Sequence, residues 1–285
     1  MTRKPFLLAA VLALTCWFAG SPDSSASDFQ SPRITSLGGA GHAGPLLNDS
    51  IYLNPSFAAF LPTYSLAASY LNYSGTGPGN PDNHGRNYSV SIHDGRSSLF
   101  QAGVAYTVRQ DGTFLHVSGA TSLFARTGLG LSGKFFFGNP KLLNGQDMTF
   151  SFTGVPSKVF QTALIVDNLL ETKATLQRGM YREIVLGMKV NIMDILMIYA
   201  DPHLAPNAPD RFGHEVGLEF VIMRDFFLRM GNFRNANNPQ TSTRGNGWGA
   251  GLGWIAPKLS LDYGFGRLIG PVSVTTHVIG ATIFF

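Results

Sequence analysis

The last fourteen residues of the chain, Val272 to Phe285, read VSVTTHVIGATIFF and predict a β-strand that ends on a phenylalanine. The same chain begins with Arg3, Lys4 and an apolar run from Phe6 to Phe18, which is typical of an export signal. A strand placed in lipid must pair both of its edges, so the sheet has to close and the last strand must pair with the first. Together the two ends predict a transmembrane β-barrel of a bacterial outer membrane.

The alternation in this last strand predicts which of its faces meets lipid. His277 falls on the same face as the apolar residues, which we interpret as a β-bulge near Thr275 and Thr276. We expect the C-terminal Phe285 to take part in barrel closure and to be recognised by the barrel-assembly machinery. The residues of the expected lipid face are Phe285, Ile283, Ala281 and Ile279.

The N-terminal residues 1–26 are predicted to be a signal peptide that is cleaved after Ala26. The apolar run is too short to cross about 30 Å of hydrocarbon, and no other stretch approaches the roughly 20 apolar residues of a membrane-spanning helix. Cys16, the only cysteine, lies inside this run behind a poor lipidation sequence. After cleavage no thiol remains, which excludes disulfides and thiolate chemistry.

The composition favours a lipid-facing wall over an ordinary soluble domain. Charged residues make up 13% of the chain, where roughly a quarter is usual, and there are 33 glycines and 22 phenylalanines. The formal charge of +4 is spread along the chain without a basic run. Nucleic-acid binding is therefore not expected.

From Tyr64 onward the chain divides into about fourteen segments of strand length, separated by Gly, Pro, Asn or Asp. Short turns alternate with longer polar stretches, including Ser74 to Arg86 and Arg234 to Gly245, as in bacterial barrels with both termini in the periplasm. The weakest strands are Asp147 to Thr153 and Ile195 to Asp201, and without them twelve would remain. The predicted fold is all-β: a transmembrane antiparallel β-barrel over residues 63–285.

Residues 27–62 precede the first strand and carry a run of small residues followed by two short polar motifs. In this pattern the chain resembles the FadL-type outer-membrane transport superfamily, which also contains the PorV-like proteins of type IX secretion. Ser56 departs from the resemblance, since alanine is commoner there. The matching residues are Gly38, Gly39, Ala40, Asn48, Asp49, Ser50, Asn54 and Pro55, and Gly41 in the same small-residue run is also assigned to the plug.

The resemblance implies that residues 27–62 fold back into the lumen as a plug, or hatch. A barrel of about fourteen strands is too wide for its own side chains to fill, so a lumenal plug would keep it from leaking water. Pro55 would fix a bend that the Asn54 side chain caps. The alternative is a flexible leader that only positions the first strand.

Ionisable residues on the expected lumen face are interpreted as a hydrogen-bonding and ion-pairing network between wall and plug, because charges in a low-dielectric lumen tend to be paired. A polar pore lining is the alternative. These residues are Lys134, Glu183, Lys189, Glu215, Glu219, Arg229 and Asp262.

The function implied by the resemblance is passive uptake of small hydrophobic molecules, fatty-acid-like or aromatic, through an outer-membrane channel. The alternatives are a PorV-like partner of a secretion complex and a closed structural barrel. Expected partners are outer-membrane lipid and a hydrophobic small molecule. The candidate ligand contacts are Leu142, Leu143, Leu169, Leu170 and Leu204 in the loops, with Leu196 and Ile198 as a lumenal stripe.

No catalytic residue, cofactor or metal site is expected. The seven histidines are scattered without paired-ligand spacing, and the Gly38–Gly41 run lacks the strand and lysine of a phosphate-binding loop. His84 with Asp82, and His203 with Asp201 and Asp210, are the only candidates for a catalytic set at the rim. Loops naturally collect such residues, so we expect no enzyme activity.

Overall fold

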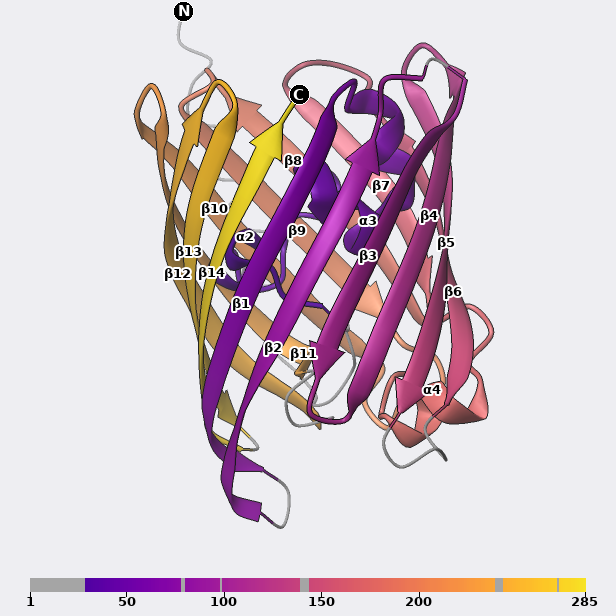
Figure 1. Cartoon of the computed structure of the whole chain (residues 1–285), viewed down its shortest axis with the longest axis vertical. Helices are drawn as coiled ribbons and strands as arrows, with labels where there is room; N and C mark the ends of the chain where they lie inside the picture. Colours follow the sequence, from indigo (N-terminus) through magenta and orange to yellow (C-terminus); the bar gives the residue numbers. More distant parts are fainter. Residues whose placement is uncertain (1–28, 78–79, 98, 139–143, 239–242, 271) are drawn as a thin grey trace, which may run out of the picture.

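The structure is a computed structural model that describes residues 29–77, 80–97, 99–138, 144–238, 243–270 and 272–285, so the predicted signal peptide lies outside the described residues. Fourteen antiparallel strands form a closed ring in which every strand pairs with its neighbours in sequence and β1 pairs with β14 (Figure 1). The strands are β1 (Tyr64–Gly77), β2 (Asn80–Asp94), β3 (Gln101–Arg109), β4 (Gly112–Phe124), β5 (Thr127–Gly138), β6 (Gly145–Gly154), β7 (Phe160–Asp167), β8 (Glu183–Ile192), β9 (Leu196–Leu204), β10 (Phe212–Met223), β11 (Phe226–Asn238), β12 (Thr243–Ala256), β13 (Leu259–Gly270) and β14 (Val274–Phe284).

The count of fourteen is confirmed, because both segments that were weakest in sequence are strands. β6 covers the short segment, and β9 covers the segment that is apolar on both faces. The strands have 8 to 15 residues, a range that includes the roughly 9–11 residues of a tilted transmembrane strand.

The seam between β1 and β14 closes the ring as the C-terminal sequence predicts. The register is continuous from Ser65 opposite Phe284 to Gly75 opposite Val274. At its end the backbone N–H of Phe285 donates to the carbonyl of Tyr64 at 2.9 Å, and the two aromatic rings meet edge to face.

The predicted lipid face of β14 points outward. Ile279, Ile283 and Phe285 are 54%, 43% and 70% exposed. The predicted bulge is wrong, because β14 pairs with both neighbours without a register shift. His277 stays on the outer face, and its ring nitrogen lies 2.9 Å from the hydroxyl of Tyr263 on the next strand. A polar partner on the same face therefore satisfies this histidine without a change of register.

The two ends of the barrel differ in their connections. We call the end that carries both termini of the barrel the turn end, and the opposite end the loop end (Figure 1). Two expected loops at the loop end are mostly strand, since β1 runs to Gly77 and β11 to Asn238. Both predictions were wrong because polar residues at a water-exposed rim lose the alternating pattern while the backbone ladder continues.

Helices occur mainly in the N-terminal segment, defined here as residues 29–62, which lies inside the ring of strands (Figure 1). A further helix, α4, lies at the loop end between β7 and β8. Among the described residues, no helix has the length and apolar character needed to cross a membrane. The helices are α2 (Pro32–Ser36), η1 (Leu47–Asp49), α3 (Ser50–Leu53), η2 (Pro55–Phe60) and α4 (Lys173–Gln177).

Candidate functional site

The N-terminal segment packs on a part of the wall that is lined by glycine. The hydroxyl of Ser31 accepts a hydrogen bond from the backbone N–H of Ile34 at 3.1 Å and so caps α2. On the facing strands β12 and β13, a Cβ on Gly249 would overlap the carbonyl oxygen of Thr35, and one on Gly264 would overlap that of Pro32. Glycine at these wall positions lets α2 lie directly against the sheet backbone.

The small-residue motif that carries the family resemblance forms the turn after α2. Gly38 and Gly39 have φ values of +64° and +92°, which favour glycine. Ala40 is fully buried and packs with Leu37 and Tyr199. The backbone N–H of Gly41 donates to the Asp201 carboxylate at 2.7 Å. This turn therefore brings the segment against strands β9 and β10.

A chain of buried charges links the N-terminal segment to the wall. Arg33 donates to the Glu219 carboxylate at 3.1 Å and to the Tyr199 hydroxyl at 2.8 Å. On the other side of Glu219, Arg229 donates to it and to Asp262, both at 2.5 Å. Arg33, Glu219 and Arg229 are each at most 4% exposed, so these pairs are little screened by solvent.

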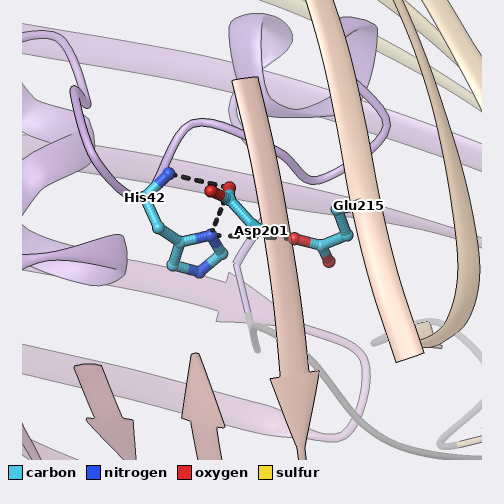
Figure 2. Close-up of side chains that lie close together, drawn as sticks. All are labelled: His42, Asp201 and Glu215. Carbon is cyan, nitrogen blue, oxygen red and sulfur yellow. Dashed lines mark hydrogen bonds and ion pairs between the residues drawn. The ribbon is translucent and has the colours of Figure 1, made fainter. Parts of the chain in front are cut away.

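A second buried group consists of His42, Asp201 and Glu215, which we call the buried triad. Figure 2 shows the three side chains pointing toward one another from the N-terminal segment, β9 and β10. The imidazole Nδ1 lies 2.9 Å from Asp201 Oδ2 and 3.7 Å from Glu215 Oε2. The backbone N–H of His42 also donates to Asp201, at 3.0 Å.

Burial by itself would lower the pKa of His42, but the hydrogen bond and the charge of Asp201 outweigh it and raise the pKa.

The backbone of His42 is held in place by the motif that begins at Asn54. Asn54, which is fully buried, donates through its side-chain amide to the His42 carbonyl at 2.7 Å and to the Thr153 hydroxyl at 2.8 Å. Pro55 follows as the first residue of η2, and the Ser56 hydroxyl donates to the Asn54 side chain at 2.7 Å.

The other polar motif contacts strands β1 and β2. Asn48 donates to the Ser91 hydroxyl at 3.0 Å and accepts from the Ser65 hydroxyl at 2.7 Å. Its neighbour Asp49 lines an internal cavity of about 70 Å³ between the segment and strands β1, β2, β13 and β14. Burial raises the pKa of Asp49 to about 6, against the opposing effect of the nearby Arg33.

The remaining ionisable residues of the predicted lumen network make further contacts inside the barrel. Lys134 forms an ion pair with Asp167 at 2.6 Å. Glu183 lies 3.7 Å from the ring of His203. The Lys189 ammonium lies 5.6 Å from the centroid of the Tyr199 ring. The predicted network is thus arranged as several groups, and only some of them reach the N-terminal segment.

Two buried apolar groups lie on the inner wall near the loop end, beside charged side chains: the guanidinium groups of Arg109 and Arg178 lie 4.8 and 4.7 Å from the centroid of the Phe114 ring. Inward-facing side chains form these groups, one across the β1–β14–β13 seam and one on β4, β5 and the connection before β8. We call these two groups the apolar lining: Leu71, Tyr73, Leu268, Val274, Val278, Phe114, Phe136 and Met180.

Only some of the predicted ligand contacts lie where the sequence places them. Leu142 and Leu143 lie outside the described residues. Leu169 is partly buried and Leu170 is 47% exposed, both in the connection after β7.

The lumenal stripe predicted on β9 is wrong. Leu196 and Ile198 pair with Phe220 and Leu218, on the strand face opposite the buried Tyr199. Leu204 shares their outward face. The segment is apolar on both faces, so alternation alone could not choose the inward one.

The two histidine–aspartate sets considered for catalysis at the rim, His84 with Asp82 and His203 with Asp201 and Asp210, differ in burial. His84 and Asp82 are exposed, with 3.1 Å between Nδ1 and the carboxylate. His203 and Asp201 are buried in β9, and Asp201 contacts His42.

Sequence reasoning missed Arg33 and His42, which make the principal polar contacts of the N-terminal segment. The sequence motif does not single out either residue, because the role of each depends on a partner on a strand that is distant in sequence. Tyr199 and Asp201 could have been predicted to face the lumen if the register of β9 were known, because alternate residues of a strand share one face.

Several solved structures share this architecture. The monoaromatic hydrocarbon channel CymD aligns with a TM-score of 0.62 and 12% identity, over 92% of this chain and 99% of its own. The toluene transporter TbuX of Ralstonia pickettii aligns with a TM-score of 0.62 and 12% identity, over 90% and 99%. The toluene transporter TodX of P. putida aligns with a TM-score of 0.61 and 8% identity, over 90% of this chain and 99% of its own.

The chain has the fold of these channels. No protein-family model matches the sequence, and no curated protein matches it either. The fold expected from the N-terminal motif and the C-terminal strand is therefore confirmed by structure at low sequence identity.

Proposed function

We propose that the protein is a bacterial outer-membrane channel that passes small apolar molecules by diffusion. The observation that carries this proposal is the apolar lining, which forms two buried groups on the inner wall near the loop end. Bacterial barrels place longer loops outside and short turns in the periplasm, so the apolar lining would face the exterior.

The fold supports the same ligand class, because the similar structures are named as channels for monoaromatic hydrocarbons or toluene. A ligand of that kind gains about 25 cal/mol for each Å² of apolar surface removed from water. The apolar lining would capture it without an energy source. Specific recognition of the ligand would need few polar contacts.

The N-terminal segment acts in this proposal as a movable plug. Two cavities border it, of about 70 and 40 Å³. A cavity of about 150 Å³ binds benzene, and both of these cavities are smaller, so passage of an aromatic molecule through them would require the segment to shift. The binding free energy of the ligand would have to favour that shifted state.

The test is uptake of labelled toluene by cells that lack other hydrocarbon channels. Expression of the protein should raise the rate several-fold over the empty vector, and Leu268→Gln should remove most of the gain. Leu268→Met keeps the apolar volume and is the matched control. Rates equal to the empty vector would refute the channel. Co-purification of a secretion complex in that case would favour the PorV-like alternative.

A version lacking residues 27–62 tests the plug separately. We expect it to admit small hydrophilic solutes that the full chain excludes. If solute leakage were unchanged while the barrel folded, the segment would not close the lumen.

A further inference from the structure

We propose that His42, Asp201 and Glu215 bind one divalent transition-metal ion of the Zn²⁺ class, which ties the N-terminal segment to strands β9 and β10. The first support is the pairing of two carboxylates. Glu215 and Asp201 are direct cross-strand partners on the inward face. Like charges directly opposite each other on neighbouring strands are destabilising, so this pair requires a neutralising group between or beside its members.

The charge of the buried triad is not balanced by protein groups. Asp201 is fully buried and Glu215 is 2% exposed. Among the described residues, His42 is the only ion-pair partner of either carboxylate. When both carboxyls are ionised, a protonated imidazole supplies one positive charge against two negative ones. The nearby Arg33 is engaged by Glu219 and Tyr199. A further cation would remove the remaining charge.

Two carboxylate oxygens also lack hydrogen-bond donors. Within the described part of the chain, Asp201 Oδ1 and Glu215 Oε2 are buried and have no hydrogen-bond partner. Asp201 Oδ2, by contrast, accepts from the backbone N–H groups of Gly41 and His42. A buried oxygen without a donor costs free energy, and a metal ion satisfies it as a donor would.

The geometry fits tetrahedral coordination. Zinc binds nitrogen and oxygen at about 2.0–2.2 Å, which places neighbouring ligand atoms about 3.3–3.5 Å apart. His42 Nδ1 lies 3.7 Å from the unsatisfied Glu215 Oε2 and 2.9 Å from Asp201 Oδ2, the oxygen that also accepts hydrogen bonds, and one atom from each residue can be chosen so that all three lie within 4.8 Å of one another. The 3.7 Å pair is within a few tenths of an ångström of that spacing.

The donor set indicates which ion is taken. An imidazole with two carboxylates suits Zn²⁺ and its first-row neighbours, whereas Ca²⁺ and Mg²⁺ prefer oxygen ligands alone. Three protein ligands leave a fourth position for water. Glu215 lines the cavity of about 40 Å³, which is large enough for that water. Sequence spacing gives no hint of the site, since residues 42, 201 and 215 meet only in the closed barrel.

The test uses the full chain in detergent, stripped with a chelator and titrated with Zn²⁺ and with Co²⁺. We expect one metal ion per chain by elemental analysis after gel filtration, and a Co²⁺ absorption band typical of tetrahedral nitrogen and oxygen ligands. Glu215→Gln preserves shape and should weaken binding at least tenfold, as should His42→Gln. The matched control is His84→Gln, which alters an exposed His–Asp pair.

Equal metal content in the wild type and both triad variants, or less than about one-tenth ion per chain, would overturn the proposal. The rival occupant would then be a proton shared within the triad. Gel mobility before and after heating verifies that each variant forms the barrel. Asp201→Asn replaces any variant that does not fold. Because metal content is measured without transport, this test can fail while the channel proposal stands.

Discussion

The guanidinium Nε of Arg33 lies 3.1 Å from the Oε2 of Glu219, and this contact joins the N-terminal segment to the barrel wall. The same carboxylate accepts from Arg229, so one buried anion lies between two cations. Asp262 on β13 contacts Arg229 and supplies the second negative charge. The network thus extends from the segment across strands β10, β11 and β13.

Replacing Arg33 with methionine should release the N-terminal segment while leaving the barrel intact. The change removes one of the two cations around Glu219 and the donor to Tyr199, at a cost of about 1–3 kcal/mol. We expect roughly tenfold faster leakage of a small hydrophilic solute from vesicles containing the protein. Arg96→Met is the matched control, because Arg96 pairs with Asp94 in an exposed connection where such pairs contribute little. Equal leakage from the two variants would argue against the buried pair as the anchor.

The glycine-lined wall provides a steric test of the same docking. Gly249→Val places side-chain atoms where the Thr35 carbonyl lies, so α2 cannot stay against β12. We expect the barrel to form, since valine suits a strand, but the segment to become accessible to protease. Gly270→Val, at a wall position with nothing within 4 Å, should leave the digestion pattern unchanged. Protection of the segment in the Gly249 variant would contradict the observed packing.

The barrel could be predicted from sequence because its physical constraints are local and repeated. Alternation on β12 and β13 and the apolar end of β14 follow from a wall that meets lipid on one side. The prediction failed where that constraint ends. Beyond the apolar band, as in the residues after Ser74, both faces of a strand meet water, so its sequence has the polar pattern expected of a loop. At His277 a single polar residue suggested a bulge, although Tyr263 provides its partner.

The candidate site was less accessible to sequence reasoning because it depends on contacts between distant segments. The motif glycines indicated close packing but not against which strands. Glu215 and Glu219 could be placed inside from the alternation of β10, yet their partners His42 and Arg33 could not. On β9 the inward face carries Tyr199 and Asp201 among apolar residues, so Leu196 and Ile198 were assigned to the wrong side. These residues are brought together by the register of the barrel strands, which cannot be predicted from any one segment alone.

The stability of the docked state should depend on pH through Asp49. Burial raises its pKa from 3.8 to about 6, with Arg33 and Arg229 opposing the shift and Asp262 adding to it. Below about pH 4 the carboxyl is protonated in both folded and unfolded chains, and its ionisation has no effect on stability. Between about pH 4 and 6 only the unfolded chain loses the proton, so this residue lowers stability as pH rises, and the loss is complete above pH 6.

Asp49→Asn imitates the protonated carboxyl at every pH and isolates this effect from other titrating groups. The free energy of unfolding of the variant, minus that of the wild type, should increase from pH 4 to pH 7.5. The increase should reach at most about 3 kcal/mol, and less if water in the adjoining cavity solvates the carboxylate. Urea unfolding in lipid vesicles, followed by tryptophan fluorescence, measures both proteins. Asp82→Asn, at an exposed position, should show a difference that does not change with pH. A flat difference for Asp49→Asn as well would mean that water solvates this carboxyl as fully in the folded protein as in the unfolded chain.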